Sequence, residues 1–254
     1  KREGVKNKMH EIVVWHIGNG TVHAKTLIMT WLTMLIILVF VLLGVRNLTS
    51  GKPGKLQNVL EWVVDFVKSL ISDNMDYKKG ASLLSYLLTL IIFIFFSNML
   101  GLIPNIFAPL FKGVEFAKLD HILGEVVMMS PTADINTTAA LATLTIILVV
   151  AYGIKNQGAH YFHHFIEPYP VFLPIHLIDF VAKPMTLAFR LFGNIYAGET
   201  LIAVILMLPG ALVFGGAIPM AAWLGFSVFI GAIQSFVFTV LTIAYIAQAV
   251  GTEH

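Results

Sequence analysis

Long stretches without any charged residue are the feature that most limits what this chain can fold into. No Asp, Glu, Lys or Arg occurs in residues 26–45, 81–111 or 135–154. Each stretch is about as long as an α-helix that crosses the ~30 Å hydrocarbon core of a bilayer. In lipid an unpaired peptide group costs several kcal/mol, so stretches of this length are expected to be helical. They therefore predict an all-α integral membrane protein.

The overall composition agrees with this class. The sequence is 57% apolar and only 12% charged, with a mean hydropathy of +0.84, whereas roughly a quarter of a soluble domain is charged. A net charge of +2 gives no indication of nucleic acid as a partner. The absence of cysteine excludes disulfides and thiolate metal sites. Because no internal repeat or low-complexity linker is visible, we predict a single membrane domain over residues 1–254.

The hydropathy pattern predicts five membrane-crossing helices and one amphipathic helix. The expected order is an outer N-terminal tail at 1–24, a first span at 25–45, the amphipathic helix at 56–72, a second span at 81–103, an outer loop at 105–132, a third span at 136–154, and two long helices at 172–208 and 217–250. The last two exceed the length that a perpendicular span requires. We therefore expect both to be strongly tilted.

The segment 56–72 is too short and too polar to cross a membrane. Its apolar residues recur at helical spacing and its polar residues line the other side: Leu56, Val59, Leu60, Val63, Val67 and Leu70 against Gln57, Glu61, Asp65, Lys68 and Ser72. This pattern predicts a helix that lies in the interface or packs across other helices. A soluble linker helix is the alternative.

The distribution of Lys and Arg predicts the orientation. The connection after the first span carries Arg46, Lys52, Lys55, Lys68, Lys78 and Lys79, whereas the loop after the second span carries only Lys112 and Lys118. The first connection should therefore be cytoplasmic. Five crossings then place the N-terminus outside and the C-terminus in the cytoplasm. The basic residues of the N-terminal tail favour the opposite orientation.

Arg190 is the strongest candidate for a functional residue on physical grounds alone, because its charge cannot be removed. Between residues 184 and 250 only two charged side chains occur, Arg190 and Glu199. A charge near the bilayer centre costs at least ~2.5–3.5 kcal/mol, and a guanidinium does not lose its proton. Arg190 must therefore face water or an anion. Mutual neutralisation by Glu199 is the alternative, but their nine-residue spacing puts them on opposite sides of a helix.

Polar residues form a stripe on the same helix as Arg190. Six positions fall within about 40° of it: His176, Asp179, Lys183, Thr186, Asn194 and Ala197. Polar residues of the last helix also share a face: Ser227, Gln234, Tyr245 and Gln248. Gln234 is the deepest amide there and is a natural hydrogen-bond companion for Arg190. Singly, such residues are more often interhelical contacts; aligned on two helices, they indicate a path for ions.

Several motifs resemble a known family. The run Leu191-Phe192-Gly193-Asn194-Ile195-Tyr196-Ala197-Gly198-Glu199, preceded by Arg190, resembles the signature of subunit a of the rotary F-type ATP synthases. Three further stretches agree: Asn98-Met99-Leu100-Gly101-Leu102-Ile103-Pro104, Ser130-Pro131-Thr132-Ala133-Asp134-Ile135-Asn136 and Gln234-Ser235-Phe236-Val237-Phe238. Their order and spacing match from about residue 25 to the end of the chain.

The resemblance implies a non-catalytic stator subunit that has no cofactor or metal. It would lie in the plasma membrane beside a rotating ring of c subunits, with peripheral stalk b subunits contacting the helix at 56–72. Two offset half-channels would load and unload protons on the ring carboxyl groups. Arg190 corresponds to the essential arginine and Gln234 to its partner, while Glu199, Asn194, Asp134 and Asn136 fall where the family lines the outer half-channel.

The sequence departs from some members of this family at two places. Ser227 occupies a position that can hold a histidine, and His176 stands where some relatives have an acid, with Asp179 offering an acid one turn later. These differences leave the individual relay groups open. A separate histidine group, His160, His163 and His164, has the spacing of a metal site but lacks a clustered carboxylate.

Other functions remain as alternatives. A Na⁺-translocating version of the same subunit is the nearest, because the ring largely sets the choice of ion. A standalone secondary transporter would favour inverted repeats and a midplane substrate site, and neither is visible. A haem-bearing electron carrier would need histidines inside facing spans, and the three shorter spans contain none.

Overall fold

The computed structural model describes residues 14–17, 20–46, 48–49, 51–107, 130–158, 161, 169–206 and 217–251. Its long helices are α1 (Ala24–Val45), α2 (Lys55–Asn74), α4 (Leu84–Phe107), α6 (Ile135–Gln157), α8 (Leu173–Leu206) and α9 (Ala217–Val250). Shorter elements are α3 (Tyr77–Gly80) and the 3₁₀ turns η1 (Ala81–Leu83), η3 (Pro131–Ala133) and η4 (Pro170–Phe172). Most of the predicted outer loop and the histidine group lie outside the described residues.

A short β-hairpin precedes α1 and corrects the purely helical prediction. Strands β1 (Val14–Ile17) and β2 (Gly20–His23) pair antiparallel, with Val14 opposite His23 and Ile17 opposite Gly20. The hairpin falls in the segment predicted as a tail. Only two residues separate the strands in the sequence, a length that is common between the strands of a hairpin. The hairpin ends at His23, which is also the N-cap position of α1.

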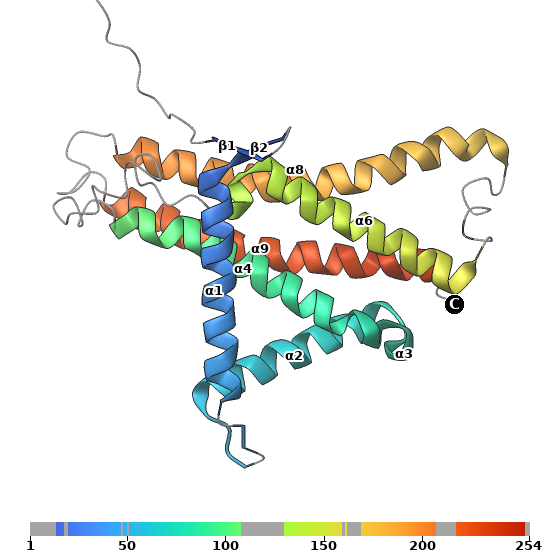
Figure 1. Cartoon of the computed structure of the whole chain (residues 1–254), viewed down its shortest axis with the longest axis horizontal. Coiled ribbons are helices and arrows are strands. Elements are labelled where there is room, and N and C mark those ends of the chain that lie inside the picture. The colour runs from blue at the N-terminus through green and yellow to red at the C-terminus, as the bar shows by residue number, and fades with distance from the viewer. Residues whose placement is uncertain are drawn as a thin grey trace, which may run out of the picture.

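The helices do not form a parallel bundle. In Figure 1, α1 stands upright, whereas α6, α8 and α9 run across it at a steep angle. Helix α9 packs against α4, α6 and α8, and α6 also packs along α8. Buried side chains fill the space between α4, α6, α8 and α9, including Leu187, Leu191 and Phe238. The central part of α8 is therefore held by contacts on two sides.

Four helices are long and apolar enough to cross a membrane within the described residues. They are Ala24–Val45, Tyr77–Leu102, Ile135–Gln157 and Ile218–Val250. Helix α8 has sufficient length, but it carries the charged and polar residues around Arg190. By composition alone it does not qualify, so the predicted count of five is not reached by this criterion.

Two predicted boundaries differ from the structure. Helix α4 continues past Pro104 to Phe107, whereas the second span was expected to end at residue 103. The fixed φ of proline is compatible with a helical turn, and only its missing N–H and the ring limit the helix. The segment 130–132 was predicted as the end of the outer loop. It is instead buried, and it packs between α4 and α8.

Helix α2 is amphipathic, but the side that it buries differs from the apolar side that the sequence predicts. Val67 and Ile71 are fully buried against the rest of the chain, whereas Leu56, Val59 and Trp62 are exposed. Gln57, predicted on the polar side, is buried because its amide bonds the Thr49 backbone and the Glu61 carboxylate. The exposed apolar side chains leave a surface on α2 that the described residues do not cover.

Candidate functional site

Arg190 lies midway along α8 with its side chain half-buried. Its neighbours Leu187 and Leu191 point into the core and are essentially inaccessible. Phe189, on the other side, is 52% exposed. Arg190 makes no hydrogen bond or ion pair within the described part of the chain. Glu199 does not neutralise it, as the nine-residue spacing predicts.

The expected hydrogen bond between Arg190 and Gln234 is not formed by the described residues. Gln234 instead accepts a hydrogen bond of 3.0 Å from Asn194 Nδ2. Asn194 is one helical turn beyond Arg190, so it lies on the same face of α8. Gln234 is buried between the helices. It therefore joins α9 to α8 close to Arg190, but through the neighbouring polar residue of the stripe.

A cavity of about 150 Å³ lies beside Asn194. Ser227 lines it from α9, and its buried hydroxyl has no hydrogen-bond partner among the described residues. The absence of a side chain at Gly198 helps to leave this space open between α8 and α9. A volume of this size accommodates several water molecules, and Ser227 and Asn194 provide polar partners for them.

Glu199 is held by a turn from a distant part of the sequence. Its carboxylate Oε1 accepts a 2.7 Å hydrogen bond from the backbone N–H of Ser130. A side chain at Gly101 would collide with both Glu199 and Ser130, so this close approach requires glycine. Lys25, near the start of α1, also interacts electrostatically with Glu199. Helices α1, α4 and α8 thus meet at this carboxylate.

A buried hydrogen-bond network fixes the turn that binds Glu199. The Ser130 hydroxyl bonds the Ser97 carbonyl at 2.7 Å and the Thr132 hydroxyl at 2.6 Å. Thr132 also donates to Asn98 Oδ1 at 2.7 Å, and Asn98 Nδ2 donates to the carbonyl of Gly231 at 2.9 Å. These polar side chains are almost completely buried. The network therefore joins α4, η3 and α9 directly behind Glu199.

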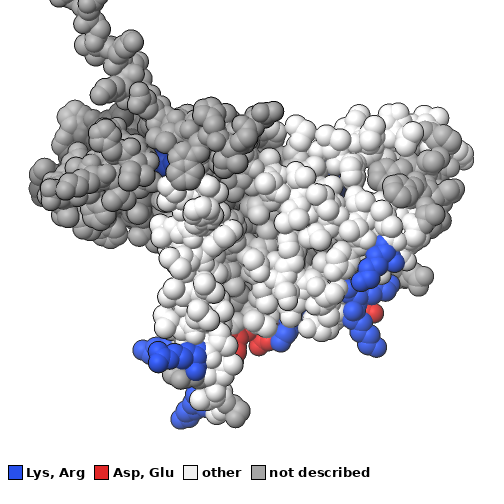
Figure 2. Space-filling view, viewed as in Figure 1, with Lys and Arg blue, Asp and Glu red and all other residues white. Residues whose placement is uncertain are grey.

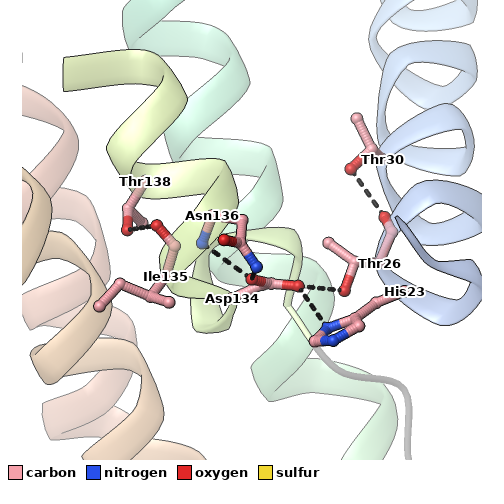
Figure 3. Close-up of polar contacts among 7 residues, drawn as sticks. All are labelled: His23, Thr26, Thr30, Asp134, Ile135, Asn136 and Thr138. Carbon is pink, nitrogen blue, oxygen red and sulfur yellow. Dashed lines mark hydrogen bonds and ion pairs between the residues drawn. The ribbon is translucent and has the colours of Figure 1, made fainter. Parts of the chain in front are cut away.

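Asp134 ends the same turn and caps α6. Figure 3 shows its carboxylate between α1 and α6. Oδ1 accepts from the backbone and side-chain N–H groups of Asn136 at 2.9 and 3.0 Å. Oδ2 contacts His23 Nδ1 at 3.0 Å and accepts from Thr26 Oγ1 at 2.8 Å. Burial favours a higher pKa, but the hydrogen bonds and the nearby His23 together lower the pKa of Asp134.

A second polar group lies near the start of α8. We call His176, Asp179, Lys183, Tyr245 and Gln248 the Lys183 cluster; they line a cavity of about 270 Å³. Lys183 Nζ is 2.9 Å from Asp179 Oδ2 and 3.3 Å from Gln248 Oε1. It also lies over the Tyr245 ring, 5.3 Å from the centroid. The structure therefore brings these five residues, predicted on two helices, to one cavity.

We call Glu199, Lys25, Ser130 and Asp134 the Glu199 cluster. This cluster and the Lys183 cluster lie on opposite sides of Arg190 along α8. Lys183 precedes Arg190 by about 10 Å of helix and Asn194 follows it by about 6 Å, at 1.5 Å per residue. Polar residues thus lie on both sides of a guanidinium that has no partner among the described residues. No group of His, Asp and Glu suited to a metal ion occurs within the described ranges.

Comparison with known proteins identifies the family. The family model described as ATP synthase A chain matches residues 27–247. The chain belongs to the ATP synthase A chain family. It is 41% identical to ATP synthase subunit a of Desulforamulus reducens over 242 residues, which cover 94% of this chain and 84% of that protein. It is 38% identical to the Bacillus subtilis subunit over 248 residues, covering 92% and 95% of the two chains. The Oceanobacillus iheyensis subunit is 39% identical, covering 95% and 96%.

As a member of this family, the chain is a non-catalytic subunit of the membrane sector of an F-type ATP synthase. Family membership accounts for the apolar helices and for the motifs around Arg190 and Glu199. It does not by itself assign a role to any of these side chains.

Sequence reasoning missed several residues that surround the predicted site. His23, Lys25 and Thr26 lie at the start of α1, more than a hundred positions from Asp134 or Glu199, and no local pattern links them. Asn98 and Ser130 belong to motifs that resemble the family, but no pattern in the sequence predicts which residues they contact. One signal was available: Asp134 directly precedes an apolar helical run, which is typical of an N-cap, and the structure has it there.

Proposed function

We propose that this chain is the stationary ion-conducting subunit of the membrane sector, with two offset half-channels that Arg190 separates. One observation carries the proposal: the guanidinium has no partner within the described residues, while cavities that each include polar side chains lie on either side of it along α8. A permanent charge in such a place needs an anion that the described residues do not supply. A carboxylate of a rotating ring of c subunits would provide it.

The outer half-channel would use Asp134, Asn136, Glu199, Asn194 and Ser227. The cavity beside Asn194 and the carboxylate of Glu199 lie on the same side of Arg190, and Ser227 offers an unsatisfied hydroxyl to water. Gln234 supports this end of the path by holding Asn194 in place. Glu199 is the ionisable group that would take up and release protons near the ring.

The Lys183 cluster would form the half-channel that opens to the cytoplasm. His176, Asp179, Tyr245 and Gln248 line its cavity. The cavity is larger than the one beside Asn194, and Asp179 is largely exposed. Water would therefore provide much of the conducting path on this side.

Arg190 would act electrostatically on each arriving ring carboxyl. At 4 Å and an effective dielectric constant of ~20, two unit charges attract by about 4 kcal/mol. This attraction favours the ionised carboxylate and releases its proton to the exit half-channel. The same positive charge would repel a proton moving directly between the half-channels. Transport would then require rotation of the ring.

The surfaces of the chain suit the remaining partners. Exposed apolar side chains flank Arg190 on α8, including Met185, Phe189 and Tyr196, and would face the ring. The uncovered side chains of α2, Trp62 above all, would contact the b subunits of the peripheral stalk.

The charge distribution supports one orientation. In the plasma membrane the N-terminus would lie outside and the C-terminus in the cytoplasm. In Figure 2 the visible Lys and Arg side chains gather at the lower edge, around α2 and α3, which is the face expected in the cytoplasm.

Arg190→Ala tests the proposal in vesicles that contain the assembled complex. We expect ATP-coupled proton transport to be lost and passive proton leak to rise when the ring can turn. Arg190→Lys should rescue poorly, because lysine has a compact charge and a shorter reach. Lys183→Ala is the matched control, since it also removes a cation from α8; it should not produce the leak. Near-normal pumping by Arg190→Ala would contradict the proposal.

A further inference from the structure

His23 connects the surface of the chain to the polar groups behind Glu199. Its ring nitrogen Nδ1 lies 3.0 Å from Asp134 Oδ2, although the two residues are 111 positions apart. The His23 side chain is 41% exposed, whereas that of Asp134 is only 9% exposed. One partner of the pair therefore meets the outside of the chain and the other is buried.

Asp134 is bound in a way that favours its carboxylate form. Oδ1 receives two hydrogen bonds from Asn136, and Oδ2 receives one from Thr26 in addition to the His23 contact. Figure 3 shows Thr26 and His23 approaching this oxygen from the α1 side. A carboxylate can only accept, so the proton of the His23 contact belongs to Nδ1. Nε2 is then the nitrogen at which the ring gains or loses a second proton.

The pair is also linked to Glu199. Asp134 and Ser130 are the two ends of one buried turn, and Ser130 donates to Glu199. Lys25, two residues after His23, interacts with Glu199 as well. Among the described residues, the charged group in contact with His23 is Asp134 at the start of α6, and the nearby charged groups on α1 and α8 are Lys25 and Glu199, which interact with each other.

We infer that His23, held by Asp134, is a proton-collecting group at the mouth of the outer half-channel. This inference rests on the function proposed above. The imidazole of His23 takes up a proton at Nε2 from the outer solution. It then releases the same proton from Nε2 to water on the path toward Glu199. Histidine suits this task because its charge changes between about pH 5 and 8. The carboxylate of Asp134, whose pKa is lowered, does not offer such an exchange.

The test measures ATP synthesis by the assembled complex in proteoliposomes at a fixed membrane potential. The pH is varied only in the compartment that the N-terminus of α1 faces, and each rate is divided by that of the wild type at the same pH. For His23→Gln we expect a ratio near one at about pH 6 that falls several-fold by about pH 8. Free imidazole in that compartment should restore His23→Ala at the higher pH.

Thr26→Val is the matched control for a structural role of His23. It removes a hydrogen bond from the same oxygen of Asp134 but no titratable group. The rate of ATP synthesis by Thr26→Val, divided by that of the wild type, should not depend on pH. A flat ratio for His23→Gln, a failure of imidazole to rescue His23→Ala, or the same pH-dependent loss in Thr26→Val would overturn the inference.

Glu199→Gln in the same vesicles separates this inference from the proposed function. If Glu199→Gln transports normally, the outer path itself is wrong and the inference falls with it. If Glu199→Gln is inactive and His23→Gln behaves as the wild type at every pH, only the role of His23 is wrong.

Discussion

The two ends of α8 hold their polar side chains in different ways. In the Glu199 cluster Ser130 is buried and the other three residues are half-buried, and hydrogen bonds and electrostatic contacts join α1, α4, η3 and α8. The five residues of the Lys183 cluster lie on α8 and α9, and their ion pair is an i,i+4 contact with a largely exposed aspartate. Exposed pairs contribute about 0–1 kcal/mol, whereas loss of one partner in a buried network costs about 1–3 kcal/mol.

This difference shows what fixes the positions of the polar side chains in each half of the path. At the Glu199 end, protein groups fix the carboxylate before an ion arrives. At the Lys183 end, a larger cavity and more exposed side chains leave the arrangement to water. Substitutions should therefore have larger effects in the Glu199 cluster.

The largest difference is expected between Glu199→Gln and Asp179→Asn. Glutamine keeps an oxygen that accepts from Ser130 but cannot ionise, so ATP-driven proton pumping should fall at least several-fold while the complex still assembles. Asp179→Asn removes a carboxylate in an exposed setting and should reduce pumping far less. Acidification of inverted vesicles, normalised to the assembled complex, measures both. Equal losses in the two variants would show that the ends of the path are equally sensitive.

A smaller effect is expected for Thr132→Val, which tests the network behind Glu199. Valine has a similar shape but leaves Asn98 Oδ1 buried without its donor. We expect a loss of about 1–3 kcal/mol in stability, seen as a lower thermal midpoint of the purified complex, together with slower pumping. Thr143→Val is the control, because Thr143 is exposed on α6. If both variants have the wild-type midpoint, the network does not stabilise this end of the path.

The smallest effect is expected from the pH dependence of Asp134. Its pKa is lowered in the folded chain, so its hydrogen bonds stabilise the native state above the unfolded pKa of about 3.9. This contribution is lost as the pH falls through the lower, folded pKa. The thermal midpoints of wild type and Asp134→Asn should therefore differ at neutral pH and converge in acid. A difference that persists at low pH would mean that the carboxylate charge is not what stabilises the α1–α6 contact.

Some features of the site follow from local sequence alone. Arg190 is conspicuous because it lies in an apolar stretch, and helical spacing places Lys183 and Asn194 on its face. The partner across the interface is another matter. Gln234 was expected at Arg190 and contacts Asn194 instead. Periodicity gives the side of a helix on which a residue lies, but the choice between partners one turn apart depends on how two helices slide and rotate against each other.

The same limit applies to α2 and to the turn at η3. The pattern of α2 indicates an amphipathic helix, but Gln57 is buried because Thr49 and Glu61 satisfy its amide. Ser130 and Thr132 look like loop residues by composition. They are buried because Ser97 and Asn98 on α4 bond them. In both cases hydrogen bonds compensate for the loss of water: the partners of Gln57 lie 4 and 8 positions away in the sequence, whereas Ser130 and Thr132 bond residues 33 and 34 positions away.

The sequence by itself determined that this chain is a helical membrane protein. It also determined that Arg190, whose charge cannot be removed by loss of a proton, lies in an apolar helix. Those conclusions depend on the solvation of side chains and peptide groups, which local composition governs. Only the tertiary structure brought His23 to Asp134 and Ser130 to Glu199. These contacts join segments more than sixty positions apart, and they form because the packing of α1, α4 and α8 closes around one buried turn.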